Sequence, residues 1–154
     1  MASRQRARER WCRYATSLAA CLLLAGCGSR GPERVPVSGR ISYGGGDWSA
    51  EGLITFNCLE PDPGCPRGSG VGRFDRQGNY TVLSHTGQAE GLYPGTYKLQ
   101  IECWETRPAM DGSPGKSYVP ATFAHSDDAS LTVKVEAKTP LVHNFNVPKR
   151  SDLP

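Results

Sequence analysis

Cysteine and histidine are the residue types in this 154-residue sequence whose spacing could support chemistry. Pairs of cysteines form disulfides, and cysteine together with histidine binds zinc or supports nucleophilic catalysis. The candidates are Cys58, Cys65, Cys103, His85, His125 and His143. Their spacing matches neither a zinc knuckle nor a paired-histidine motif, and no G-x-S-x-G elbow is present. The sequence therefore predicts no metal site, no cofactor and no catalytic centre.

The N-terminal segment has the three-part layout of a secretory signal. Five arginines precede an apolar stretch over residues 18–24, and small residues follow it. The whole apolar run is about a dozen residues long, whereas a membrane-spanning helix needs about 20. This layout predicts a cleaved signal peptide over residues 1–26.

The residues Leu24-Ala25-Gly26-Cys27 look like the lipobox of bacterial lipoproteins. In that family a diacylglycerol is attached to the cysteine sulfur, and the chain is cleaved just before the cysteine. The resemblance implies lipidation at Cys27 and a membrane tether over residues 27–34, because two or more acyl chains anchor a protein stably. Gly28 and Ser29 follow the cysteine where inner-membrane lipoproteins tend to have aspartate, which favours the outer membrane.

The net charge of the chain depends on this segment. The whole sequence is formally +3, but the first 26 residues contain five arginines and one glutamate. The remaining 128 residues carry 13 basic and 14 acidic side chains, which leaves them at −1. A nucleic-acid-binding protein would show a clustered basic face. The composition of the exported part therefore predicts no nucleic-acid partner.

Export would place the remaining cysteines in a compartment that permits disulfides. Cys58, Cys65 and Cys103 are then disulfide candidates, and two pairings are open. A Cys58–Cys65 bond would close a small loop and would form easily, whereas a Cys58–Cys103 bond would join two strands. Chain-entropy arguments assign about 2.5 kcal/mol to the first and about 4 kcal/mol to the second. Either pairing leaves one thiol free.

Apolar and polar residues alternate along much of the chain, which predicts that β-strands position the candidate cysteines and histidines. Gly78 is expected at a positive-φ turn position between two of them. The expected strands or extended pieces span residues 35–43, 52–58, 70–75, 79–83, 97–103, 117–124, 131–135 and 142–147. About seven short strands without a helix predict an all-β fold. We expect a single seven-stranded antiparallel β-sandwich over residues 35–148, with a C-terminal tail at 149–154.

The order of these elements resembles that of small bacterial lipoproteins with a carboxypeptidase-regulatory-like domain, a transthyretin-like (prealbumin-like) β-sandwich. The matching stretches are VPVSGRISY, GLITF, RFDRQGNYTV (D-x-x-G-x-Y/F), LYPGTYKLQI (L-x-P-G-x-Y) and the closing half from YVPATF to HNFNV. The likeness covers nearly all of residues 35–147, with departures at the cysteines and at the glycine triplet 44–46. It implies an extracytoplasmic module, usually non-catalytic, that serves as a spacer, a binding surface or an assembly element.

Three aromatic residues are candidates for ligand binding. Trp104 falls on the polar side of its strand, and Trp48 lies in a glycine-rich loop. With Tyr118 they could form a platform on which sugar rings stack. The preferred interpretation, however, is that the tryptophan rings close the ends of the sandwich. His143 shares strand parity with Phe145, which predicts a packed or edge histidine.

The sequence thus predicts an acylated, membrane-tethered protein of the cell envelope. Its expected partners are the membrane, through the lipid on Cys27, and envelope proteins or glycans. A non-catalytic structural or protein-interaction module is the leading interpretation, and a glycan-binding module is the alternative. A transthyretin-like hydrolase or a metal-binding protein is a weaker alternative, since the chain ends in KRSDLP and lacks the Y-R-G-S-type tail of those hydrolases.

Overall fold

The computed structural model describes residues 31–125 and 131–150. Cys27, the expected signal peptide and the last four residues lie outside the described part of the chain, so lipidation stays a prediction. Nearly all regular structure in the described residues is β-strand, which confirms the all-β fold class. No helix among these residues is long and apolar enough to span a bilayer.

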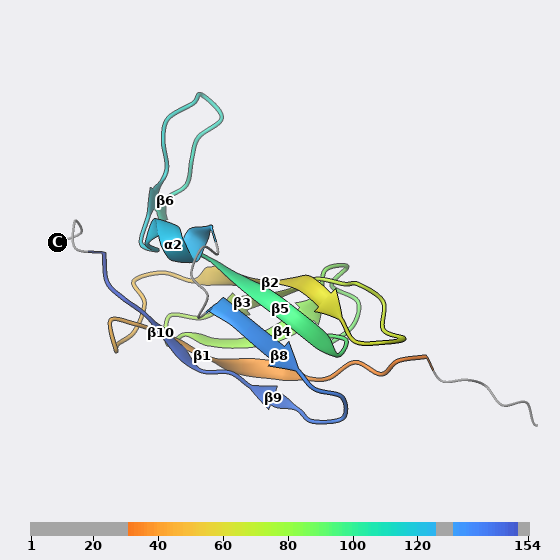
Figure 1. Cartoon of the computed structure of the whole chain (residues 1–154). Coiled ribbons are helices and arrows are strands. Elements are labelled where there is room, and N and C mark those ends of the chain that lie inside the picture. The colour runs from red at the N-terminus through yellow and green to blue at the C-terminus, as the bar shows by residue number, and fades with distance from the viewer. Residues whose placement is uncertain (1–30, 126–130, 151–154) are drawn as a thin grey trace, which may run out of the picture. The chain divides into compact units, whose positions relative to one another are not determined.

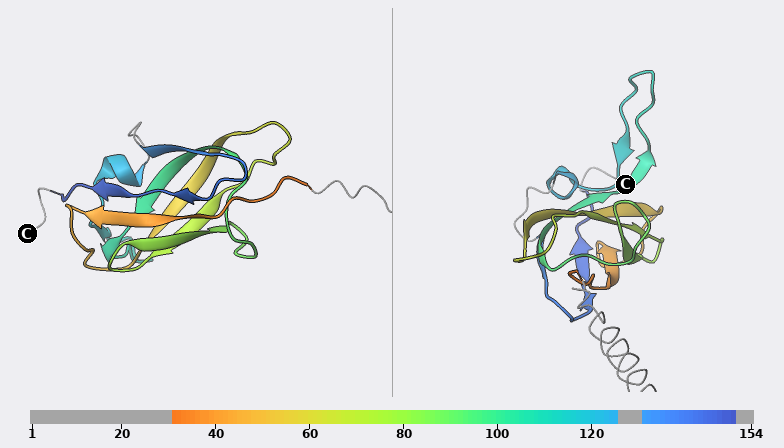
Figure 2. Two further views of the ribbon diagram at one scale, coloured as in Figure 1. Left: turned by 90° about the horizontal axis from the view of Figure 1, so that it is seen from below. Right: turned by 90° about the vertical axis from the view of Figure 1, so that its right-hand side faces the viewer.

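The described domain contains ten strands and one short helix (Figure 1). In chain order they are β1 (Val37–Tyr43), β2 (Gly52–Pro61), β3 (Gly70–Phe74), β4 (Asn79–Ser84), β5 (Gly95–Glu102), β6 (Trp104–Thr106), β7 (Lys116–Ser117), α2 (Ala121–Ala124), β8 (Thr132–Val135), β9 (Leu141–Val142) and β10 (Phe145–Val147). The main sheet has the order β10-β1-β4-β3-β2-β5-β8, with β9 also paired to β1, and β6 pairs with β7. Only residues 136–140 link β8 at one end of this order to β9 at the other, so the sheet curves back on itself (Figure 2).

The main sheet is mixed, whereas an antiparallel sandwich was expected. β1 runs parallel to β9 and β10, and every other step from β1 to β8 is antiparallel. Five antiparallel steps leave β8 running opposite to β1. The chain then reverses through residues 136–140, so β9 and β10 run in the same direction as β1. The prediction missed this because the alternation of side chains contains no information about strand direction.

The inward faces of the strands follow the predicted alternation. In β5, Tyr97, Leu99 and Ile101 are buried, whereas the side chains between them are partly exposed. The same pattern holds in β2 and β8. The largest fully buried side chains form one cluster with members from six strands: Tyr97, Phe56, Phe74, Ile41, Ile54, Leu92, Leu99, Ile101, Leu131, Val37, Val82 and Val135. Alternation succeeds here because successive side chains of a pleated strand point to opposite faces.

The D-x-x-G-x-Y stretch forms the turn between β3 and β4, and each of its defining residues has a structural role there. Asp75 accepts hydrogen bonds from the side-chain amide and the backbone N–H of Asn79, at 3.1 and 2.8 Å, and these bonds lower the pKa of its carboxyl. Gly78 has a φ of 85°, as predicted. Its carbonyl accepts a hydrogen bond from the Ile41 N–H at 2.9 Å, and Tyr80 is buried in the core. The motif therefore closes the turn and docks it on β1.

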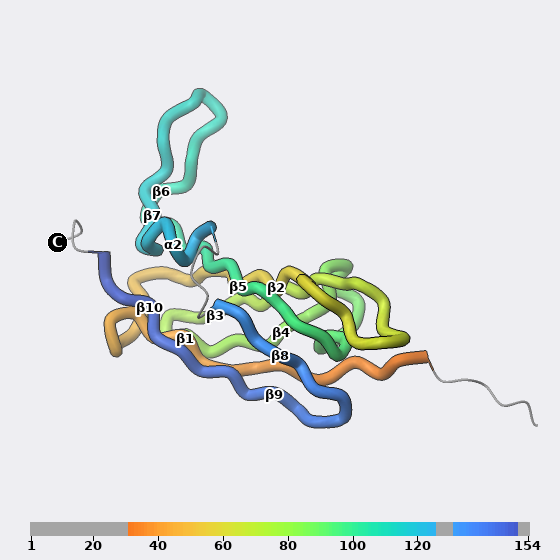
Figure 3. The backbone as a smooth tube through the Cα atoms, viewed as in Figure 1, coloured from red at the N-terminus to blue at the C-terminus, as the bar shows by residue number. Residues whose placement is uncertain are grey.

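Residues 117–124 differ from the expected extended piece. The chain leaves β7 at Ser117, and α2 then forms a helical turn directly after Pro120. The His125 N–H donates to the Ala121 carbonyl at 2.9 Å. Proline is tolerated at the start of a helix because its missing N–H has no partner there. Figure 3 shows the hairpin of β6 and β7 leaving the body of the domain beside α2.

Candidate functional site

The three cysteines in the described part of the chain are free thiols. Cys58 lies opposite Tyr97 in the register of β2 and β5, and Cys103 follows Tyr97 by six residues. At about 3.3 Å per residue, the two cysteines are about 20 Å apart along the sheet. Disulfide-bonded residues have Cα atoms within about 7 Å of each other. The Cys58–Cys103 pairing is therefore wrong, because strand parity shows a shared face but not a separation along it.

Cys58 and Cys65 lie at the same end of the domain. The chain turns back after β2, since the Cys65 N–H donates to the Asp62 carbonyl at 2.9 Å. The Arg67 guanidinium donates to the Cys58 carbonyl at 3.0 Å. Burial above all, and also the nearby Cys58 and Cys65 thiols, raise the pKa of the Tyr97 hydroxyl. Of the two pairings, only Cys58–Cys65 stays a prediction, and both of its thiols are reduced in this structure.

Cys103 should resist alkylation in the folded, reduced protein. Its side chain is fully buried, with the sulfur 3.6 Å from the Ala50 carbonyl and 3.7 Å from the Glu51 carbonyl. Burial raises the pKa of the thiol to about 11, so the reactive thiolate at pH 8 is about a hundredfold scarcer than for an ordinary cysteine. Maleimide at pH 8 should modify Cys65 in the native protein and Cys103 only after denaturation. Equal native labelling of both, read by peptide mass spectrometry, would contradict the buried position.

Trp48 does not belong to an exposed platform. It is 3% exposed, and its ring stacks on Tyr43 and packs against Phe74, with centroids 4.7 and 4.9 Å apart. Its indole N–H donates to the Ile41 carbonyl at 2.8 Å. The glycine-rich sequence suggested an exposed loop, but the loop folds back and the Trp48 backbone N–H donates to the Arg76 carbonyl. The assignment of Trp48 to ligand binding is thus corrected, and the residue belongs to the core.

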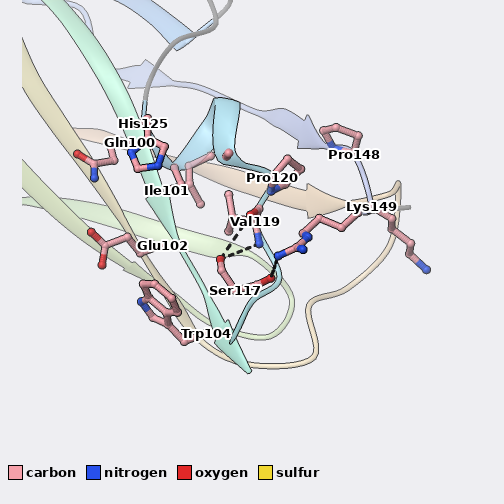
Figure 4. A pocket seen from close by; sticks show the side chains of 13 residues that line it. Gln100, Ile101, Glu102, Trp104, Ser117, Val119, Pro120, His125, Pro148 and Lys149 are labelled. Carbon is pink, nitrogen blue, oxygen red and sulfur yellow. Dashed lines mark hydrogen bonds between the residues drawn. The ribbon is translucent and has the colours of Figure 1, made fainter. Parts of the chain in front are cut away.

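Trp104, in contrast, lines a hollow in the surface (Figure 4). The hollow has a volume of about 670 Å³ and lies between the outer face of β5, the base of the β6–β7 hairpin, α2 and residues 148–150. We call this hollow the Trp104 groove. Tyr118 does not line it, because this ring lies edge-on to Tyr43 with centroids 6.3 Å apart. Of the three aromatic candidates, the structure therefore places only Trp104 at this hollow.

The Trp104 groove presents outward-facing polar side chains of β5 beside the indole. Gln100 and Glu102 occupy the outward positions of β5, and Figure 4 shows both along one side of the groove, with Trp104 next to Glu102. Within residues 31–125 and 131–150, these three side chains form no hydrogen bond or ion pair. Arg150 differs, because its guanidinium donates to the Ser117 carbonyl at 2.8 Å. That bond ties the segment after β10 to the hairpin and builds the opposite wall.

A second hollow shares two of these side chains. Glu102 and Trp104 also line a hollow of about 380 Å³, together with Leu53, Arg73 and Arg107. Trp104 and Glu102 therefore border both hollows, and a ligand that extended through both would contact Trp104 in each.

The three histidines do not converge. His143 packs against Phe145 with ring centroids 5.3 Å apart, and burial lowers the pKa of its imidazole. His85 follows β4, and His125 follows α2 at the edge of the Trp104 groove. In the part of the chain that the structure describes, no three side chains of histidine, cysteine, aspartate or glutamate are grouped as metal ligands would be.

Gln100 and Glu102 were not among the residues singled out from the sequence. They precede Trp104 by four and two residues. In an extended chain, positions i, i+2 and i+4 lie on one face. This spacing was the available signal, and it would have placed a carboxylate and an amide beside the indole.

Comparison of the chain with protein-family models, with curated proteins and with solved structures gives no match. The resemblance to lipoproteins with a transthyretin-like domain therefore depends on the residues of this chain alone.

Proposed function

We propose that the protein is a lipid-anchored lipoprotein on the extracytoplasmic side of a bacterial cell envelope, where its all-β domain is a non-catalytic structural or protein-interaction module. We also assign this domain to the transthyretin-like sandwiches, as a variant in which β9 and β10 lie parallel to β1. In support, the D-x-x-G-x-Y stretch forms the β3–β4 turn and the P-G-x-Y stretch begins β5.

The position of Val35, the first buried residue in the described part of the chain, carries the proposal. Val35 is 2% exposed, and its backbone exchanges hydrogen bonds of 2.7 and 2.9 Å with Leu92. Val35 follows Cys27 by eight residues. Among the described residues, the buried core thus begins directly after the stretch that resembles a lipobox and its tether. Residues 28–34 can span at most about 25 Å, so acylation at Cys27 would hold the domain close to the membrane surface.

The serine in the Trp104 groove supports binding over catalysis. The Ser117 hydroxyl donates to the Cys103 carbonyl at 3.1 Å and accepts a hydrogen bond from the Val119 N–H at 3.0 Å. A nucleophilic serine would instead be bonded to a base such as histidine. These backbone bonds give Ser117 a structural role at the base of the hairpin.

Replacing Cys27 by serine should abolish membrane attachment. The hydroxyl cannot take the place of the thiol that receives the lipid, so the variant should remain unacylated and keep its N-terminal segment. Mass spectrometry of protein from a bacterial host and detergent phase partitioning measure both effects. Cys21→Ser is the matched control, because this cysteine lies in the apolar stretch before the lipobox. Wild-type protein with an unmodified Cys27 would overturn the proposal.

A further inference from the structure

We propose that the Trp104 groove binds a saccharide chain. This inference deepens the proposed function, because an envelope location would place the groove among cell-surface glycans.

The indole of Trp104 supplies the stacking surface. The side chain is only partly buried although it follows Cys103, which is fully buried. An indole in contact with water on the surface retains a large apolar face. The C–H groups on one side of a pyranose ring match such a face. Because Trp104 borders both hollows, sugar units on either side of a stacked ring would have room.

The polar groups beside the indole select hydroxyl-rich ligands. The Glu102 carboxylate accepts hydrogen bonds, and the Gln100 amide both donates and accepts. Neither side chain has a partner in the described residues. Sugar hydroxyls donate and accept as well, so they can satisfy both groups next to the ring that they cover. The hollow volumes of about 670 and 380 Å³ fall in the range of small-molecule sites.

Other ligand classes fit this chemistry less well. An apolar peptide side chain over Trp104 would remove water from Glu102 and Gln100 without replacing their hydrogen bonds, which is costly. A phosphate-rich polymer would meet the Glu102 carboxylate, which borders both hollows, although Lys149 and Arg150 line the other side of the Trp104 groove. A neutral or N-acetylated oligosaccharide avoids both penalties.

The test is a titration of the full chain in detergent with maltohexaose, cellohexaose and chitohexaose, followed by calorimetry and tryptophan fluorescence. We expect at least one of these probes to bind. Trp104→Ala should weaken that binding about tenfold or more, as truncation of a central aromatic anchor does. Trp104→Phe should retain part of the affinity, and Glu102→Gln should weaken binding several-fold.

Met110→Ala is the matched control, because Met110 is fully exposed between β6 and β7 and borders neither hollow. It should bind like the wild type, and thermal unfolding should show that Trp104→Ala remains folded. Absence of binding for all three probes, or unchanged affinity in Trp104→Ala, would overturn the proposal. The titration does not depend on acylation, so a failed Cys27 test and a failed saccharide test are distinguishable.

Discussion

Replacing Trp48 by alanine should lower the free energy of unfolding by about 3–5 kcal/mol, as truncation of large buried aromatic residues does. The indole is enclosed between Tyr43 and Phe74, so the substitution removes apolar burial and leaves a cavity. It also removes the 2.8 Å hydrogen bond to the Ile41 carbonyl, and that buried acceptor loses a partner. Since domains are stable by only about 5–15 kcal/mol, a large fraction of the stability should disappear. Urea denaturation followed by circular dichroism measures the change.

Trp104→Ala provides the matched control, because it removes the same side chain from a partly exposed position. Its cost should be about 1 kcal/mol or less, as for most surface substitutions. Trp48→Phe should recover part of the loss, since phenylalanine keeps an aromatic ring but has no N–H. Equal losses in Trp48→Ala and Trp104→Ala would contradict the placement of Trp48 in the core.

Gly78→Ala should destabilise the domain by at least about 3 kcal/mol, because backbone strain and a steric clash act together. Gly78 has a φ of 85°, where a residue with a Cβ is strained. A Cβ at this position would lie 1.9 Å from the Ile41 carbonyl oxygen, which belongs to the backbone of β1. Relief of the clash would require the β3–β4 turn to leave β1. Thermal and urea unfolding measure the loss.

Gly45→Ala separates the contribution of backbone strain from that of the steric clash. Gly45 has nearly the same φ, 82°, but a Cβ there would meet no atom within 4 Å. The free energy of unfolding of this variant should fall by only about 1–2 kcal/mol, which is the conformational cost of a positive φ. A Gly78→Ala loss no larger than that of Gly45→Ala would show that the turn does not pack closely against β1.

The candidate site was partly predictable. Trp104 was correctly placed on the outward side of its strand, because parity is a local property of an extended chain. The sequence left Trp48 open between a packed and an exposed position, because its burial depends on the return of residues 44–48 to the turn at Arg76. The groove itself was not predictable, since α2 and the Arg150 segment reach Trp104 only through long-range packing.

The alternation of side chains by itself determined the all-β class and the buried face of β2, β5 and β8. In a pleated strand, each side chain takes its direction from its own backbone, and this direction does not depend on which strand lies next to it. Only the tertiary structure decided the parallel pairing of β9 and β10 with β1, the separation of Cys58 from Cys103 and the position of Trp104 at a hollow. These features depend on the register and direction of segments far apart in the chain, which no local pattern of residues contains.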